Sequence, residues 1–306
     1  MNDTAAKWGT LALLSLVWGT TWIAIKISVN TIPPLTGAAM RFALALLILF
    51  AVARMRGIDL TPPAGAFRAI FWSAFFLYPM DYGLIYWGEQ YLNAGTTAVF
   101  FATFPLFTAV SANFLFRSEP FRWPPYIGLM LGFAGTTVVF FDQLDLSVTT
   151  GLTALAAGAV LLSALSAALS LVITKVHLGG MSSLSLTLHQ MLWGTLMLAV
   201  LSGLAGEWPD FRVTPGALAA VAYLGVVGSA MAFVLYYWLL KTMSAIALSY
   251  IIYVTPLVAL VAGWLALGEV LSWQTLAGTV IIFTGIALSR VGTRRRPVSA
   301  PGRPAA

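Results

Sequence analysis

Long apolar stretches alternate with short polar gaps along most of the chain. Each stretch holds about 20 residues, the length an α-helix needs to cross a bilayer. The pattern predicts ten membrane-spanning helices, at 8–29, 35–54, 66–88, 94–117, 121–141, 151–175, 181–203, 215–240, 244–267 and 272–291. The gaps carry proline, glycine and asparagine, which favour turns, and leave no room for a soluble domain. We therefore expect an all-α, polytopic membrane protein.

Composition agrees with this pattern. Of the 306 residues, 60% are hydrophobic and only 8% are charged, whereas soluble domains average about 25% charged residues. The chain has no cysteine, which excludes disulfides, thiolate metal sites and thiol catalysis. The net charge of +6 comes from residues scattered over short gaps and a tail, so we expect no nucleic-acid partner.

The positive charges predict the orientation of the helices. Cytoplasmic loops of membrane proteins are enriched in lysine and arginine. With the N-terminus inside, the cytoplasmic segments hold Lys7, Arg54, Arg56, Arg68, Arg117, Arg122, Lys175, Lys241, Arg290, Arg294, Arg295, Arg296 and Arg303. The outer side holds Arg212, and Lys26 near a helix end. We expect a multi-pass membrane protein with both termini in the cytoplasm.

The two halves of the sequence resemble each other at an offset near 150 residues. Matching positions are Lys26 with Lys175, Arg41 with Gln190, Tyr86-Trp87 with Tyr237-Trp238, Pro105 with Pro256, Glu119 with Glu269, Gly128 with Gly278, and Gly135 with Gly285. Each copy then holds five spans, and an odd number turns the second copy upside down in the membrane. We expect inverted repeats at 1–146 and 147–292, followed by a basic, disordered tail at 293–306. Inverted repeats are typical of alternating-access carriers, with the binding site near the midplane between them.

Several motifs resemble a known family. They are WGTTWIAIK in the first span, Arg41 in the second, and the run from Ala94 through Phe104-Pro105-Leu106 to Glu119 and Gly128, all with counterparts in the second copy. The chain resembles the drug/metabolite transporter superfamily, most closely its EamA-type branch and the bacterial aromatic amino-acid exporters of the YddG type. The resemblance covers nearly the whole chain. One departure is Thr20-Thr21, where the family motif usually has asparagine after Trp-Gly.

Asp81 is the first candidate site residue, because it interrupts an apolar span. Counted from the span ends, Arg41, Asp81 and Lys26 all lie about 10 Å below the outer surface. Asp81 can therefore pair with Arg41 or Lys26. Two interpretations stay open: the pair contacts the ammonium or carboxylate of a substrate, or it is a structural ion pair between helices.

Aromatic residues share the helix face of Asp81. Tyr78, Asp81, Tyr82, Ile85 and Glu89 recur at spacings of three and four, which is one face of a helix. Tyrosines combine an apolar ring with a hydroxyl that needs a partner, which suits a wet cavity. Trp18 either lines that cavity or packs outside it, while we assign Trp22, Tyr86 and Trp87 to the aromatic belt at the membrane interface.

The second half supplies further candidates. They are His189 and Gln190, opposite Met40-Arg41, and Tyr250 and Tyr253, one turn apart. His189 either faces the cavity or bonds to a neighbouring helix. Pro105 and Pro256 remove backbone hydrogen bonds within helices and act either as gating hinges or as static kinks.

Other motifs indicate structural roles. We expect the glycines near 128–135 and 278–285 to let helices pack closely, with a dimer contact as an alternative. We assign Glu119 and Glu269 to capping or solvated positions at helix ends.

The function class follows by comparison. A membrane enzyme would need a catalytic cluster or metal set, and a channel would need rings of polar residues; the sequence offers neither, and we expect no cofactor and no metal. We expect a monomeric or weakly dimeric carrier that exports amino acids, aromatic or apolar ones first. The alternatives are an exporter of hydrophobic cations or drugs, and a channel-like facilitator.

Overall fold

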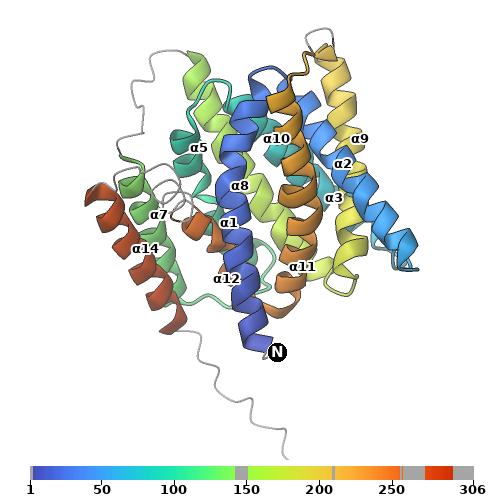
Figure 1. Ribbon diagram of the computed structural model, residues 1–306. Coiled ribbons are helices and arrows are strands. Elements are labelled where there is room, and N and C mark those ends of the chain that lie inside the picture. Colours follow the sequence, from blue (N-terminus) through green and yellow to red (C-terminus); the bar gives the residue numbers. More distant parts are fainter. Residues whose placement is uncertain (1–2, 142–150, 209–210, 256, 258–272, 292–306) are drawn as a thin grey trace, which may run out of the picture.

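The computed structural model describes residues 3–141, 151–208, 211–255, 257 and 273–291 (Figure 1). All regular elements within these residues are helices. Six of them are long and apolar enough to cross a membrane: Ala5–Val29, Pro34–Met55, Gly95–Leu115, Gly151–His177, Ser183–Leu204 and Pro215–Thr242. This confirms the helical, polytopic architecture. The predicted ninth span at 244–267 runs into residues outside the described part.

The helices of the two halves follow one another in the predicted order. The first half contains α1 (Asp3–Val29), α2 (Pro34–Met55), α3 (Phe67–Leu77), α4 (Leu84–Gly88), α5 (Ala94–Phe101), α6 (Phe104–Val110) and α7 (Trp123–Val139). The second contains α8 (Gly151–His177), α9 (Ser183–Leu204), α10 (Pro215–Gly225), α11 (Ala232–Thr242), α12 (Ala245–Ser249) and α14 (Trp273–Val291).

π-helical segments interrupt the third span of each half at matching places. Segment η1 (Tyr78–Gly83) joins α3 to α4, and η5 (Val226–Met231) joins α10 to α11; η2 (Ser111–Leu115) follows α6. Pro79 lies in η1, where a wider turn accommodates its missing N–H. Such segments often occur at functional sites, and η1 carries Asp81.

Helix starts are capped by polar side chains. Asn93 accepts a hydrogen bond from the Thr96 N–H (2.7 Å) at the start of α5, and Ser244 accepts one from Ala247 (3.0 Å) at the start of α12. The Glu119 carboxylate accepts from the Ala245 N–H at 2.6 Å. Because carboxylates are favoured at helix N-termini, Glu119 stabilises α12, which confirms its predicted capping role. Glu269 lies outside the described residues.

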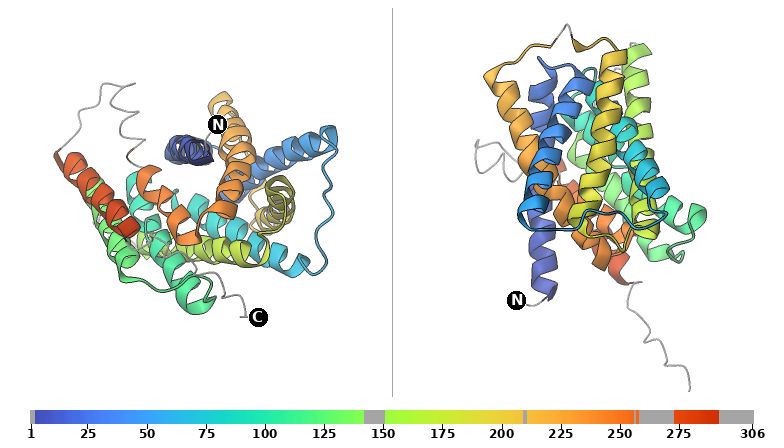
Figure 2. Two further views of the ribbon diagram at one scale, coloured as in Figure 1. Left: turned by 90° about the horizontal axis from the view of Figure 1, so that it is seen from below. Right: turned by 90° about the vertical axis from the view of Figure 1, so that its right-hand side faces the viewer.

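Two pairs of helices, one from each half, pack along their length. Helix α2 packs against α9 and α7 against α14, while α3 lies against α8 and α1 against α10. Seen from below, the α7–α14 pair lies at one side of the molecule and the α2–α9 pair towards the other (Figure 2). Glycines allow the α7–α14 approach: a Cβ on Gly135 would lie 2.8 Å from the Gly278 carbonyl oxygen. The predicted glycine packing is confirmed, as a contact within one chain.

Two lysines make equivalent contacts in the two halves, which we call the lysine clamps. The Lys26 ammonium donates to the main-chain oxygens of Glu89 (2.5 Å) and Leu92 (3.2 Å). Lys175 donates to those of Leu240 (2.5 Å) and Met243 (2.8 Å). Each clamp satisfies carbonyl groups left free where the third helix of its half ends. The offset of about 150 residues between them matches the sequence repeat.

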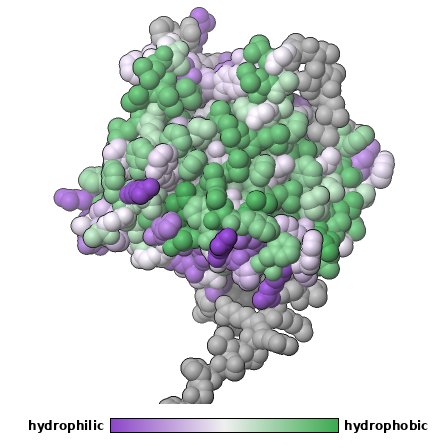
Figure 3. All heavy atoms as spheres, turned by 180° about the vertical axis from the view of Figure 1, so that it is seen from behind, coloured by the Kyte–Doolittle hydropathy of each residue, from purple (hydrophilic) through white to green (hydrophobic). Residues whose placement is uncertain are grey.

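The outer surface is largely apolar. Viewed from behind, hydrophobic residues cover most of the face and hydrophilic ones gather along its lower edge (Figure 3). Large side chains are exposed on several helices, including Leu47, Phe114, Leu155, Leu204 and Val280. A soluble protein rarely exposes so much contiguous apolar surface. These exposed apolar side chains therefore form the lipid-facing surface.

The glycine contact between α7 and α14 gives a first prediction. Gly135→Ala places a methyl group against the backbone of Gly278 and Ile282, so the change should lower stability by about 1–3 kcal/mol. Gly158→Ala in α8 is the matched control, because a Cβ there meets no atom within 4 Å; its stability should stay the same or rise by up to about 1 kcal/mol. Unfolding in mixed micelles measures both. Equal effects of the two changes would contradict the packing role.

Candidate functional site

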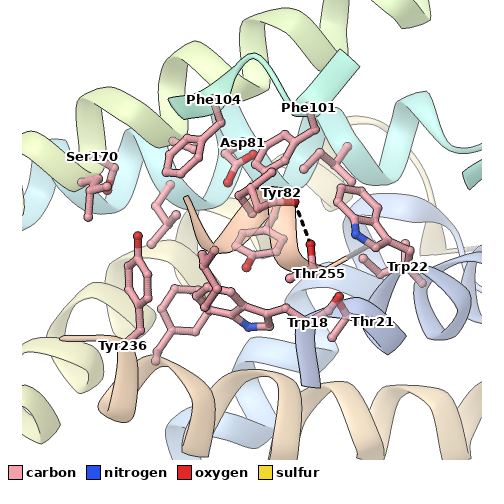
Figure 4. Close-up of a pocket in the computed structure, with 18 of the residues that line it drawn as sticks. Trp18, Thr21, Trp22, Asp81, Tyr82, Phe101, Phe104, Ser170, Tyr236 and Thr255 are labelled. Atoms are coloured by element: carbon pink, nitrogen blue, oxygen red, sulfur yellow. Dashed lines mark hydrogen bonds between the residues drawn. The ribbon is translucent and has the colours of Figure 1, made fainter. Parts of the chain in front are cut away.

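A cavity of about 100 Å³ lies between helices of both halves (Figure 4). Trp18 and Ser170 line it from well inside α1 and α8, whereas Phe101 ends α5 and Phe104 begins α6. The described lining residues are Trp18, Thr21, Trp22, Ile25, Leu77, Asp81, Tyr82, Ile85, Phe101, Phe104, Ala167, Ser170, Leu171, Phe233, Tyr236, Tyr237, Ile251, Ile252 and Thr255. A cavity deep within a bundle, formed by both halves, is a suitable place for binding a small molecule.

Aromatic rings form most of the cavity wall. On one side, Trp18 packs against Tyr236, with ring centroids 4.9 Å apart, and against Phe233 at 5.9 Å. On another side, Phe101 and Phe104 stack with an interplanar angle of 4° and a centroid distance of 5.7 Å, and Trp22 meets Phe101 edge-on. Rings held by one another in this way offer flat faces to a bound ring or aliphatic side chain.

Asp81 is the one charged residue among the described lining residues. It projects from η1 and is only 3% exposed, and its Oδ1 atom has no hydrogen-bond partner. A buried carboxylate oxygen without a donor costs free energy. The same oxygen is a ready acceptor for an ammonium group entering the cavity.

Arg41 lies next to this wall but is not one of the lining residues. Its Nε donates to the Ser229 hydroxyl (2.7 Å) and its Nη2 to the Gly228 carbonyl (3.2 Å). Its guanidinium also lies 4.9 Å from the centre of the Tyr82 ring, a cation–π distance. Nη1 has no partner. Arg41 therefore ties α2 to η5 of the other half and supports a cavity residue.

Comparison with known proteins identifies the family. The sequence pattern of the EamA-like transporter family matches residues 7–141 and, a second time, residues 154–291. The chain belongs to the EamA-like transporter family.

Similar proteins cover nearly the whole chain. The uncharacterized inner membrane transporter YedA of Escherichia coli K12 is 30% identical over 303 residues, covering 96% of this chain and 94% of YedA. PagO of Salmonella typhimurium is 28% identical over 293 residues (94% and 93% covered), and the uncharacterized transporter YoaV of Bacillus subtilis is 25% identical over 288 (93% and 97%). One solved crystal structure has a TM-score of 0.78, covering 95% of this chain and 98% of that chain; at 17% identity it shows the fold alone.

Only part of the predicted site lies around the cavity of this EamA-like transporter. Trp18, Asp81 and Tyr82 line it. Tyr78 is fully buried against Phe42, with centroids 4.6 Å apart. Gln190 is also fully buried, and its Nε2 donates to the hydroxyls of Ser73 (2.7 Å) and Thr174 (3.0 Å). These contacts hold helices together and leave neither side chain facing the cavity.

The remaining second-half candidates contact backbone groups. The Tyr250 hydroxyl donates to the Pro125 carbonyl (2.9 Å) and the Tyr253 hydroxyl to the Leu129 carbonyl (3.0 Å), so both fix the segment after α12 to α7. His189 Nδ1 lies 2.7 Å from the Ser185 carbonyl of its own helix. Neither its predicted place in the cavity nor a bond to a neighbouring helix is seen.

The predicted ion pair is wrong. No ion pair joins Asp81 to Arg41 or Lys26 within 4 Å in the described residues. Main-chain carbonyls hold the Lys26 ammonium, and Ser229 and Gly228 hold the Arg41 guanidinium, so neither cation lies against Asp81. The depth of a residue along its helix does not fix the direction in which its side chain points.

The aromatic-belt assignment is also wrong for two residues. Tyr86 is fully buried, and Trp22 lines the cavity. Both lie near helix ends in the sequence, where the belt is expected, but Tyr86 lies against Gly37 of α2 and Trp22 against Phe101 of α5.

Sequence reasoning missed much of the aromatic wall, above all Trp22, Phe101, Phe104, Phe233, Tyr236 and Tyr237. The repeat contained a signal for part of it. The repeat matches Tyr86 with Tyr237, so it places Tyr236 opposite Ile85, a residue of the predicted face. Applying the repeat to every residue of the predicted face of the third span would have identified α11 as part of the cavity wall.

The hinge candidates are only partly described. Pro105 lies in the first turn of α6, directly after a break in the helix at Ala102 and Thr103. Pro256 lies outside the described residues. Whether Pro105 bends during transport stays a prediction.

Arg41 gives a second prediction. Arg41→Met removes a buried guanidinium that holds η5 and supports Tyr82, and leaves the Ser229 hydroxyl and the Gly228 carbonyl without this donor, so stability should fall by about 1–3 kcal/mol. Arg54→Met in the same helix is the control: Arg54 is exposed, and surface changes usually stay within about 0.5 kcal/mol. Thermal unfolding of the two purified variants measures the difference. Equal midpoints would contradict the anchoring role.

Proposed function

We propose that this chain is an inner-membrane carrier that exports small amphipathic solutes, amino acids with aromatic or apolar side chains first, by alternating access. The observation that carries the proposal is the cavity: aromatic walls from both halves around one unpartnered carboxylate oxygen, that of Asp81. Rings suit an aromatic or aliphatic side chain. A carboxylate suits its ammonium group.

We also propose that residues 1–146 and 147–292 are inverted repeats and that both termini face the cytoplasm. Two matches to one family, the paired lysine clamps, and π-helical segments at matching places support the repeat. Halves related in this way can rock about a central site and open it to one side at a time. The distribution of lysine and arginine supports the orientation.

A second candidate is export of hydrophobic cations. The described lining residues include one acid and no lysine or arginine, which favours a solute with positive charge and no need for a carboxylate partner. Phosphorylated substrates fit poorly, because they call for several basic groups.

Counterflow in proteoliposomes tests the proposal. Unlabelled L-phenylalanine inside the vesicles should accelerate entry of labelled L-phenylalanine, as a carrier requires and a channel does not. Excess 2-phenylethylamine keeps the ring and the ammonium group but lacks the carboxylate. Weak competition by this amine supports amino-acid export, and stronger competition than by phenylalanine itself supports the cation exporter. Absence of stimulated exchange with either compound would contradict the carrier.

Asp81 provides the third prediction. Asp81→Asn keeps the size of the side chain and removes its charge, so transport should fall by about tenfold or more, the effect of losing one charged hydrogen bond of about 1.5–3 kcal/mol. Asp59→Asn is the control, because it makes the same chemical change in an exposed loop and should transport normally. If Asp81→Asn also transports normally, the carboxylate does not contact the solute.

A further inference from the structure

A second acid lies on the helix face of Asp81, just beyond the cavity. Asp81 and Ile85 line the cavity, and Glu89 follows four residues later. Residues four apart lie on one side of a helix, so Glu89 lies about one turn beyond the lining. It comes directly after α4 and outside the predicted span 66–88, at the end of the bundle that we propose faces outwards.

Glu89 is buried without partners for its carboxyl group. Its side chain is 0% exposed, and neither Oε1 nor Oε2 has a hydrogen-bond partner. The neighbouring Gly88 packs against two apolar residues of α8, Val160 and Ala156. An ionised carboxylate in such a place is costly, whereas the protonated acid avoids most of the penalty.

The lysine clamp does not explain this acid. Lys26 binds the main-chain oxygen of Glu89, not its carboxylate. In the second half, Lys175 makes the same contact with the main-chain oxygen of Leu240, whose side chain is not acidic. The contact between the lysine and the main chain therefore does not require the carboxyl group of Glu89.

We infer that Glu89 is a proton-binding site whose loading is linked to the opening of the outer end of the carrier. This rests on the proposed function. With the outer end closed, the buried carboxyl group holds a proton. When the helices part, water reaches it, the proton leaves, and Lys26 is the nearby cation for the resulting carboxylate. By linkage, whatever removes the proton favours the open conformation.

The electrostatic surroundings support this assignment. Burial raises the pKa of Glu89 to about 8, and Lys26 opposes this rise. The other ionisable groups nearby are Tyr86, on the same helix, and Arg41 of α2, which acts on Tyr86; in the described part of α8, the residues at Gly88 are apolar. A solvated glutamate has a pKa of about 4.3, so between about pH 5 and 8 opening releases one proton. Each unit rise in pH then favours opening by up to about tenfold.

Infrared spectroscopy and transport together test the inference, using Glu89→Gln, which keeps the shape, and Glu89→Leu, which copies the second half. The purified protein should show a protonated carboxyl band at about pH 6 that disappears at about pH 10 and is missing in Glu89→Gln. In proteoliposomes, both variants should retain phenylalanine counterflow but lose its dependence on pH. Asp59→Asn should retain both the band and the pH dependence.

The outcomes separate the two proposals. An unchanged band in Glu89→Gln overturns proton binding, and an unchanged pH profile in both variants overturns the linkage, while wild-type counterflow still supports the carrier. Absence of counterflow in the wild type contradicts the proposed function; the infrared band then still decides whether Glu89 holds the proton.

Discussion

Lipid offers no hydrogen bonds, so every polar group that this chain carries across the apolar layer must find its partner within the protein. That constraint explains the most regular contacts in the structure. Lys26 and Lys175 bind the carbonyl groups where a helix ends, and Arg41 and Gln190 each bind a serine of the opposite half. The lysine contacts stabilise the same helix end within each half, while the Arg41 and Gln190 contacts join the two halves.

Against this background, the groups left without partners are the informative ones. Asp81 has an unpartnered oxygen beside the aromatic cavity, and Glu89 has two, one turn beyond it. Both acids lie on the same face of the third span, and the π-helical segment η1 carries the first. We propose that these carboxyl groups serve visiting partners, an ammonium group at Asp81 and a proton at Glu89.

The architecture followed from the sequence because its causes are local or periodic. Span lengths, helix caps such as Glu119, and the close approach at Gly135 depend on residue type and spacing; six of the ten predicted spans, the Glu119 cap and the Gly135 contact are seen in the described residues. The direction of side chains did not follow. Tyr78 and Tyr82 share one predicted face and both pack against Phe42, yet only Tyr82 lines the cavity, because both lie in a π-helical segment, where the spacing of a face differs from that of an α-helix.

A single cysteine tests the central claim of one cavity reached from either side in turn. The chain has no natural cysteine, so Ser170→Cys, a small change in the cavity wall, can be labelled alone with an impermeant thiol reagent. The account predicts labelling from both membrane faces, slowed by phenylalanine, and no labelling of Ser28→Cys, which is fully buried away from the cavity. Labelling of Ser170→Cys from one face only, unaffected by phenylalanine, would contradict alternating access.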